Sequence, residues 1–253
     1  MAERSKYETL KQISVLTALD TATWIAGEVL DSVTLVLSLP KWLDPSNEGQ
    51  VYITWTIWAL RLLVWSLTLA ALSRLSDLRN AFGKARIWYL FSLLAFIAQP
   101  LGASGAHYRY PALTPLSRAD AFFFVQVLII LAMITCLEEA SLCFGKRVIL
   151  FAGADLLETF GLEEHAMKNR RCGNRLLICA AARMSFLLCV FAVTWISLAK
   201  QFSFFDNESI DLLLCAAVSL WCLFLAELGN IAFQILAASR MKRTYLAIRE
   251  LTE

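Results

Sequence analysis

Hydrophobic residues in this chain gather in six long runs that shorter polar segments separate. The runs cover about residues 14–37, 52–73, 87–104, 121–137, 176–199 and 211–238. Each run approaches the roughly 20 residues that an α-helix needs to cross a hydrocarbon core about 30 Å thick. The pattern therefore predicts an all-α, polytopic membrane protein, with about six transmembrane helices in a single membrane domain over residues 1–253.

The first run is amphipathic, which leaves two interpretations open. On a helical wheel one face carries only polar or small residues, namely Thr17, Asp20, Thr21, Gly27, Glu28, Asp31, Thr34 and Ser38. Such a helix either spans the membrane with this face against other helices, or lies flat in the membrane interface. Interfacial helices usually carry Lys or Arg on the polar face, whereas the charges here are acidic, and this difference favours a span.

Composition and charge agree with a membrane protein and set its orientation. Hydrophobic residues make up 58% of the chain and charged residues 17%, against roughly 45–50% and about 25% in soluble domains. If the lysines and arginines between the runs are assigned to alternate sides, 17 fall on the side of both termini and four on the other. Because positive residues concentrate in cytoplasmic loops, both termini are predicted to be cytosolic.

Charged residues inside the runs need partners. Arg61 lies near the middle of the second run and Glu28 near the middle of the first. A lone charge at that depth costs at least about 2.5 kcal/mol on insertion scales. We therefore expect Arg61 to pair with Glu28, with Asp31 as a second acceptor, and so to hold the second span against the first.

A second polar set lies in the last two runs. Arg183 lies in the fifth run, while Glu227, Asn230 and Gln234 follow one another at helical spacing in the sixth. Together with Asp20 in the first run and the Arg61 group, they form a predicted intramembrane polar network. The network is either an ion or substrate path or a set of structural pairs that hold helices together.

The longest connector, residues 138–175, combines an apolar patch with a basic end. Four large apolar residues are followed by four cations, namely Leu156, Leu157, Phe160 and Leu162, then Lys168, Arg170, Arg171 and Arg175. This order is typical of a cytosolic amphipathic helix at a membrane surface with anionic headgroups. An ordinary loop with a positive cytosolic flank has the same composition, so both interpretations remain open.

Several classes of function are not expected from this sequence. A net charge of +2 offers no basic surface for nucleic acid. Both histidines, His107 and His165, lie outside the apolar runs, and no nucleotide-binding, hydrolase or metal-binding motif is present. We therefore expect no catalytic residues, metal site or cofactor. The expected partners are the lipid bilayer and either further copies of this chain or other membrane proteins.

One short stretch resembles a known family. Leu137-Glu138-Glu139 is followed, after a short gap, by Phe144-Gly145-Lys146 and Leu150. This is similar to a stretch of the peroxin-11 family in which an acidic residue precedes a Trp-Leu-x-Lys-x-Gly run, with Phe144 in place of the tryptophan. Members of that family are peroxisomal or glycosomal membrane proteins that elongate and help divide the organelle. The resemblance thus implies a role for Glu138, Phe144 and Lys146 in a protein of this kind.

Three functions are compatible with these observations. The first is a non-enzymatic protein that shapes or divides an organelle membrane, with the peroxisome as the expected location. The second is an accessory subunit of a multi-subunit membrane complex, for example in mitochondria. The third is a small solute or ion transporter that uses the intramembrane charges.

Overall fold

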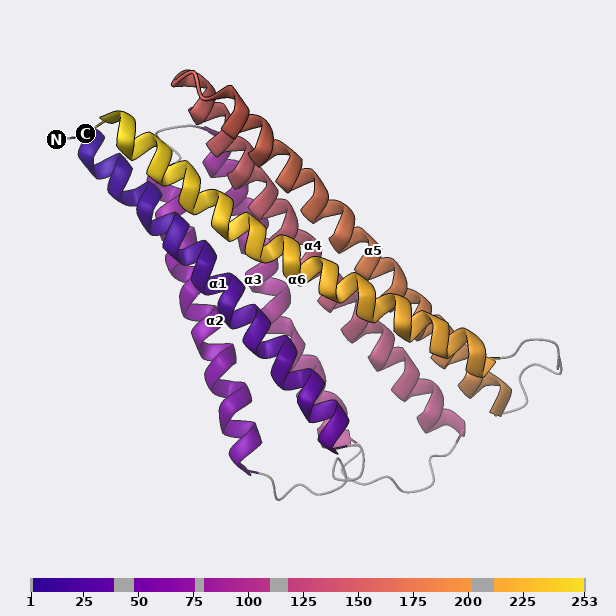
Figure 1. Ribbon diagram of the computed structural model, residues 1–253. Coiled ribbons are helices and arrows are strands. Elements are labelled where there is room, and N and C mark those ends of the chain that lie inside the picture. Colours follow the sequence, from indigo (N-terminus) through magenta and orange to yellow (C-terminus); the bar gives the residue numbers. More distant parts are fainter. Residues whose placement is uncertain (1, 39–47, 76–79, 110–117, 202–211, 253) are drawn as a thin grey trace. The chain divides into compact units, whose positions relative to one another are not determined.

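The described part of the chain is helical except for a short turn at residues 160–162. This computed structural model describes residues 2–38, 48–75, 80–109, 118–201 and 212–252. Within these ranges six helices follow one another, and Figure 1 shows them in chain order: α1 (Ala2–Ser38), α2 (Glu48–Leu75), α3 (Asn80–Arg109), α4 (Arg118–Thr159), α5 (Glu163–Gln201) and α6 (Leu212–Thr252). The predicted all-α class is confirmed.

Four of the described helices contain segments long and apolar enough to cross a membrane. These segments are Thr56–Leu75 in α2, Ala81–Ala98 in α3, Glu163–Cys189 in α5 and Trp221–Leu251 in α6. They overlap the second, third, fifth and sixth predicted spans and indicate an integral membrane protein. The predicted spans at 14–37 and 121–137 include many side chains outside the described part, so both remain predictions.

The chain divides into two compact units. The first comprises Met1–Leu90, Phe144–Arg175 and Phe233–Glu253, and the second comprises Phe91–Cys143 and Leu176–Ala232. Helices α1 and α2 belong wholly to the first unit, whereas each of the other four helices contributes one part to each unit.

Helix α1 buries its polar residues together with Leu10, Ile13 and Trp24, and it exposes other apolar residues. Thr17 and Asp20 are fully buried, whereas Val15 is 50% and Leu19 is 46% exposed. The Thr17 hydroxyl donates to the Ile13 carbonyl oxygen at 2.8 Å, so its burial leaves no hydroxyl unsatisfied. A water-soluble protein mostly exposes its polar residues. The burial of these polar residues therefore favours α1 as a span that meets other helices over a helix lying in the interface.

Helices α1 and α2 pack in antiparallel fashion. Asp20 of α1 meets Trp65 of α2, and Gly27, further along α1, faces Ile57, which lies earlier in α2. Residue numbers thus rise along one helix as they fall along the other. A Cβ added at Gly27 would lie 3.8 Å from Ile57, an ordinary contact distance, so the packing at this position has room for one.

The predicted connector at 138–175 is not a separate element, which corrects the sequence interpretation. Helix α4 continues to Thr159, and α5 begins at Glu163 after a short turn. At the turn Gly161 has φ 75°, its N–H donates to the Glu158 carbonyl oxygen at 3.0 Å, and the Leu162 N–H donates to the Leu157 carbonyl oxygen at 3.0 Å. These two bonds form a Schellman motif.

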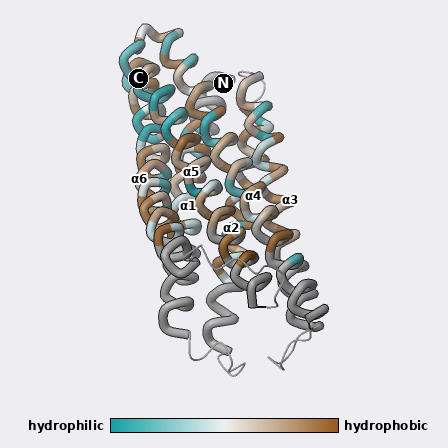
Figure 2. The backbone as a smooth tube through the Cα atoms, turned by 90° about the vertical axis from the view of Figure 1, so that its right-hand side faces the viewer, coloured by the Kyte–Doolittle hydropathy of each residue, from teal (hydrophilic) through white to brown (hydrophobic). Residues whose placement is uncertain are grey.

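The helices extend past the predicted membrane ends because no residue stops them. The chain contains no proline after Pro115, so α4 runs on until the glycine turn, and the basic C-terminal segment continues α6 to Thr252. Figure 2 shows hydrophilic residues around the α4–α5 turn.

Candidate functional site

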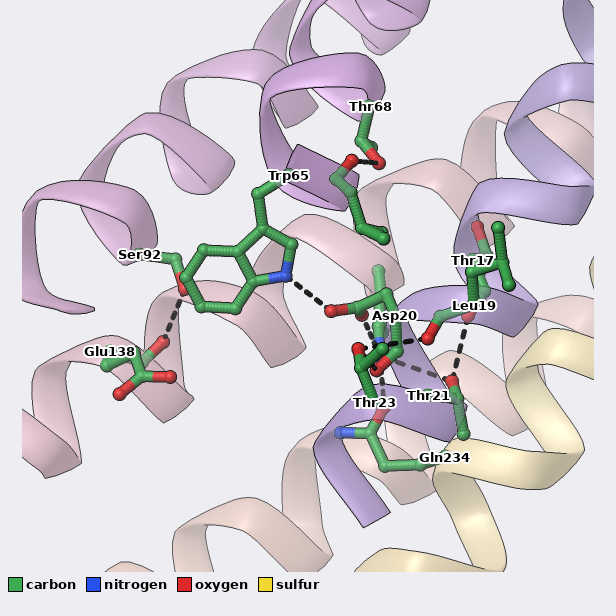
Figure 3. Close-up of polar contacts among 12 residues, drawn as sticks. Thr17, Leu19, Asp20, Thr21, Thr23, Trp65, Thr68, Ser92, Glu138 and Gln234 are labelled. Carbon is green, nitrogen blue, oxygen red and sulfur yellow. Dashed lines mark hydrogen bonds and ion pairs between the residues drawn. The ribbon is translucent and has the colours of Figure 1, made fainter. Parts of the chain in front are cut away.

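A buried ion pair lies within the first unit. The Lys146 ammonium of α4 lies 2.5 Å from the Asp20 carboxylate of α1, and the two side chains are 1% and 0% exposed. Lys146 also donates to the Gln234 side-chain oxygen of α6 at 2.6 Å and to the Thr21 hydroxyl at 3.4 Å. The Trp65 indole N–H of α2 donates to Asp20. We call these five residues the Asp20 cluster, and Figure 3 shows its contacts.

The Asp20 cluster joins four helices through one charge pair. Burial of an ion pair costs several kcal/mol per ion unless further hydrogen bonds satisfy the remaining donors and acceptors. Here Trp65 supplies a donor to the carboxylate, and Gln234 and Thr21 supply acceptors to the ammonium. The cluster therefore stabilises one particular arrangement of α1, α2, α4 and α6 within this unit.

A second cluster of charges lies in the second unit. The Arg183 guanidinium of α5 bonds both the Glu139 carboxylate of α4 and the Glu227 carboxylate of α6. Glu139 also accepts from the Asn230 side-chain amide at 2.6 Å. Arg183, Glu139 and Glu227 are 11%, 5% and 19% exposed. We call these four residues the Glu139 cluster. One cation bridges two acids, so the guanidinium is the group on which the arrangement depends.

The structure divides the polar residues that the sequence grouped together. Asn230 and Gln234, four residues apart in α6, bond Glu139 and Lys146 respectively. Arg61 places its guanidinium carbon 4.9 Å from the centre of the Trp65 ring, a cation–π distance. The side chains of Glu28 and Asp31 lie outside the described part, so the pairing of Arg61 with them remains a prediction.

Sequence reasoning missed Glu139 and Lys146 as members of the buried polar network, because it assigned both to a cytosolic connector. A signal was present. The absence of proline allows the helix to continue past 137, and a separation of seven residues puts Glu139 and Lys146 on the same face of that helix. A continuous α4 would have supplied an acid and a base to the network.

The apolar patch predicted to lie on the membrane surface does not form one exposed face. Leu157 is fully buried, whereas Phe160 is 37% exposed. Arg170 pairs with Asp155 at 2.8 Å and with Glu158 at 2.9 Å. The pairing ties α5 back to α4 across the turn, so Arg170 contributes to the helix hairpin. The other residues of the predicted surface segment are partly buried or exposed, namely Leu156, Leu162, Lys168, Arg171 and Arg175.

The three residues of the family-like motif take part in internal packing. The Glu138 backbone carbonyl oxygen accepts from the Ser92 hydroxyl at 3.0 Å. The Phe144 ring stacks on Trp88 with 4.9 Å between centroids. Lys146 belongs to the Asp20 cluster. Within the described part, each motif residue therefore has a structural partner in its own unit.

Comparisons with known proteins add no further assignment. Searches against protein-family models, curated proteins and solved structures found no match to this chain. In the described part of the chain, no group of three or more His, Cys, Asp and Glu side chains is placed to hold a metal ion. The two buried charge clusters are thus the candidate functional features.

Proposed function

We propose that this chain is a non-enzymatic integral membrane protein that shapes or divides an organelle membrane. The observation that carries the proposal is the burial pattern of the described helices, in which charged groups pair internally while many large apolar side chains are exposed beside the buried ones. Trp221 is 67% and Leu225 is 62% exposed, while Asn230 of the same helix is fully buried. The outer surface of such a protein is suited to contact with lipid or with apolar faces of other membrane helices.

The pairing within the clusters supports a structural role for the charges. Each described cluster joins its carboxylates to a cation, and this arrangement favours the locking of helices over the binding of a transported ion. The membrane would then be the main partner, and the protein would act by changing the shape of that membrane. The proposed activity, the shaping or division of a membrane, is based on the resemblance of residues 137–150 to the peroxin-11 family.

The proposal includes a topology and a location. The chain would cross the membrane six times, with α1 and the first part of α4 as spans beside the four candidate segments. The 17-to-four distribution of basic residues supports cytosolic termini. Exposed apolar residues such as Leu225 and Leu228 on α6 would serve contacts with lipid or with a second copy. The peroxisomal membrane is the proposed location, with the mitochondrial membrane as the alternative.

Imaging tests the proposal directly. A fluorescently tagged copy would be expressed above its native level beside peroxisomal and mitochondrial markers, and organelle number and length would be measured in the same cells. Longer or more numerous peroxisomes are the expected result. A location elsewhere with unchanged organelle morphology would overturn the proposal, and co-purification with other subunits at fixed stoichiometry would then favour an accessory subunit.

A small transporter is the second candidate, because the Asp20 cluster places ionisable groups deep among apolar helices. A charge-neutral double variant, Asp20→Asn with Lys146→Met, separates the two functions. If the charges are structural, the double variant folds and still changes organelle morphology. If they carry an ion or solute, it folds but loses flux in reconstituted vesicles. Its thermal unfolding in detergent provides the control for folding.

A further inference from the structure

A groove runs between the N-terminal part of α1 and the C-terminal part of α2. Its volume is about 570 Å³, within the roughly 300–1,000 Å³ of small-molecule sites. Buried Leu16 and Ala71 are among the residues that line it, and half-exposed Val15 and Leu67 line it as well. The apolar lining fits hydrocarbon.

Two exposed cations lie at one end of this groove. Lys11 precedes the apolar lining residues of α1, and Arg74 follows those of α2. Because the two helices are antiparallel, Lys11 and Arg74 converge at the same end, and the apolar residues lie together beyond them. The polar end of the groove thus holds these two cations together with Glu8 and Gln12, and the rest of its lining is apolar.

The position of the groove along α2 matches the structure of a lipid leaflet. The candidate span is Thr56–Leu75, so Arg74 lies at its end, while Leu67 and Ala71 lie within its last turns. A cation at the end of a span lies at the level of lipid headgroups, and the preceding turns lie among acyl chains. The orientation of the groove thus follows the order of groups in a phospholipid.

We propose that this groove binds one glycerophospholipid with an amine headgroup. The phosphate lies between Lys11 and Arg74, which offer charge-assisted hydrogen bonds, and the first part of an acyl chain lies on Leu16 and Ala71. Glu8 lines the groove one helical turn before Lys11, beyond the phosphate and on the side away from the acyl chain. A headgroup ammonium occupies that position, and Glu8 pairs with it.

The proposal rests on the membrane placement of α2 given above and not on the membrane-shaping activity. Because lipid binding is measured on the purified protein and organelle shape in cells, the failure of either proposal is recognisable without the other. Anionic lipid is also plentiful in the cytoplasmic leaflet, where cytosolic termini would place this end of the groove.

Native mass spectrometry of the purified full chain tests the site. Phosphatidylserine and phosphatidylglycerol carry the same net charge, but only the first has an amine, so phosphatidylserine is expected to bind more tightly. Lys11→Gln or Arg74→Gln should weaken the binding of both lipids about tenfold, the effect of losing one charge-assisted hydrogen bond. Glu8→Gln should remove the preference for phosphatidylserine and leave phosphatidylglycerol bound.

Three comparisons make the test decisive. Ala70→Trp fills the groove at an exposed position and should abolish binding without a change in the thermal unfolding midpoint. Lys84→Gln removes an exposed cation that does not line the groove and should leave binding unchanged. Glycerophosphoserine, which has no acyl chains, should not compete. Equal binding of the two lipids, retained binding in Ala70→Trp, or competition by glycerophosphoserine would each overturn the proposal.

Discussion

The structural role of an individual residue in this protein does not follow from its chemical type alone, and Lys146 is an example. Lys146 lies in a stretch rich in charges, yet it is 1% exposed and bonds Asp20, Gln234 and Thr21. An ammonium with a four-carbon stem crosses the space between helices and reaches acceptors on two of them. The residue thus works as a buried cross-link between helices.

Removal of one member of the Asp20–Lys146 pair should destabilise the protein strongly. Lys146→Met leaves the Asp20 carboxylate buried without its cation, and such changes cost about 3–5 kcal/mol. The double variant Asp20→Asn with Lys146→Met should recover most of this loss, because Asn still accepts from Trp65. Equilibrium unfolding in mixed detergent measures both, with Lys84→Gln as the exposed control. A double variant as unstable as the single one would contradict the pairing.

Gly145 should tolerate no side chain. A Cβ at this position would lie 2.8 Å from two ring atoms of Tyr89, and Tyr89 is fully buried. Gly145→Ala should therefore lower the free energy of unfolding by about 1–3 kcal/mol, the usual cost of overpacking. Gly27→Ala is the matched control, since its Cβ would meet Ile57 at an ordinary 3.8 Å. Equal thermal midpoints for the two variants would disprove this close packing.

At the scale of elements, the α4–α5 hairpin is held by its turn and by ion pairs across it. Gly161 closes α4 in a left-handed conformation, and a Cβ added there would meet no atom within 4 Å. Arg170 then joins α5 to two acids of α4. Local backbone geometry and surface charge therefore act together at this end of the first unit.

Substitution at Gly161 should change the free energy of unfolding only through the cost of a left-handed backbone conformation. Gly161→Ala places a Cβ in the left-handed region, which costs roughly 1–2 kcal/mol, and no steric clash adds to that figure. Gly161→Asn should cost less, because Asn adopts this conformation more readily. The thermal unfolding midpoints of the two variants give the comparison. A larger decrease for Gly161→Asn than for Gly161→Ala would show that an interaction other than backbone conformation determines the stability of the turn.

The Glu139 cluster should depend more on its cation than on either acid. Arg183→Gln leaves buried Glu139 and partly buried Glu227 near each other without the guanidinium, so like charges and desolvation both oppose the fold. Glu227→Gln leaves the Arg183–Glu139 pair intact. We expect the unfolding midpoint to fall further in Arg183→Gln than in Glu227→Gln. The reverse order would show that the two acids do not depend on Arg183 as their main partner.

At the scale of the whole molecule, the distribution of basic residues predicts the sidedness of the chain. A protease-sensitive reporter at either terminus should be digested when intact organelles are treated from the cytosolic side. A reporter inserted after residue 112, in the third predicted loop, should be protected until the membrane is permeabilised. Digestion of the inserted reporter in intact organelles would require a different number of spans. A soluble lumenal marker controls for intact membranes.

Helix class and the approximate position of spans could be predicted from the sequence because they depend on local properties. The length and hydropathy of a run determine whether it can cross a hydrocarbon core, and the four candidate spans overlap four of the six predicted runs. The continuation of the helix beyond the fourth run was not predicted. Hydropathy falls near residue 138, but a fall in hydropathy does not stop a helix that contains no proline, and α4 continues to Thr159.

Pairing among charges could not be predicted with the same success, because it depends on contacts between residues far apart in the chain. Asp20 pairs with Lys146, which lies 126 positions later in the chain. Asn230 and Gln234, two amides on one stripe of α6, bond members of different clusters. The sequence alone determined that this chain forms long apolar helices with charges that need partners. Only the tertiary structure decided which partners they take, because helix packing brings those groups within bonding distance.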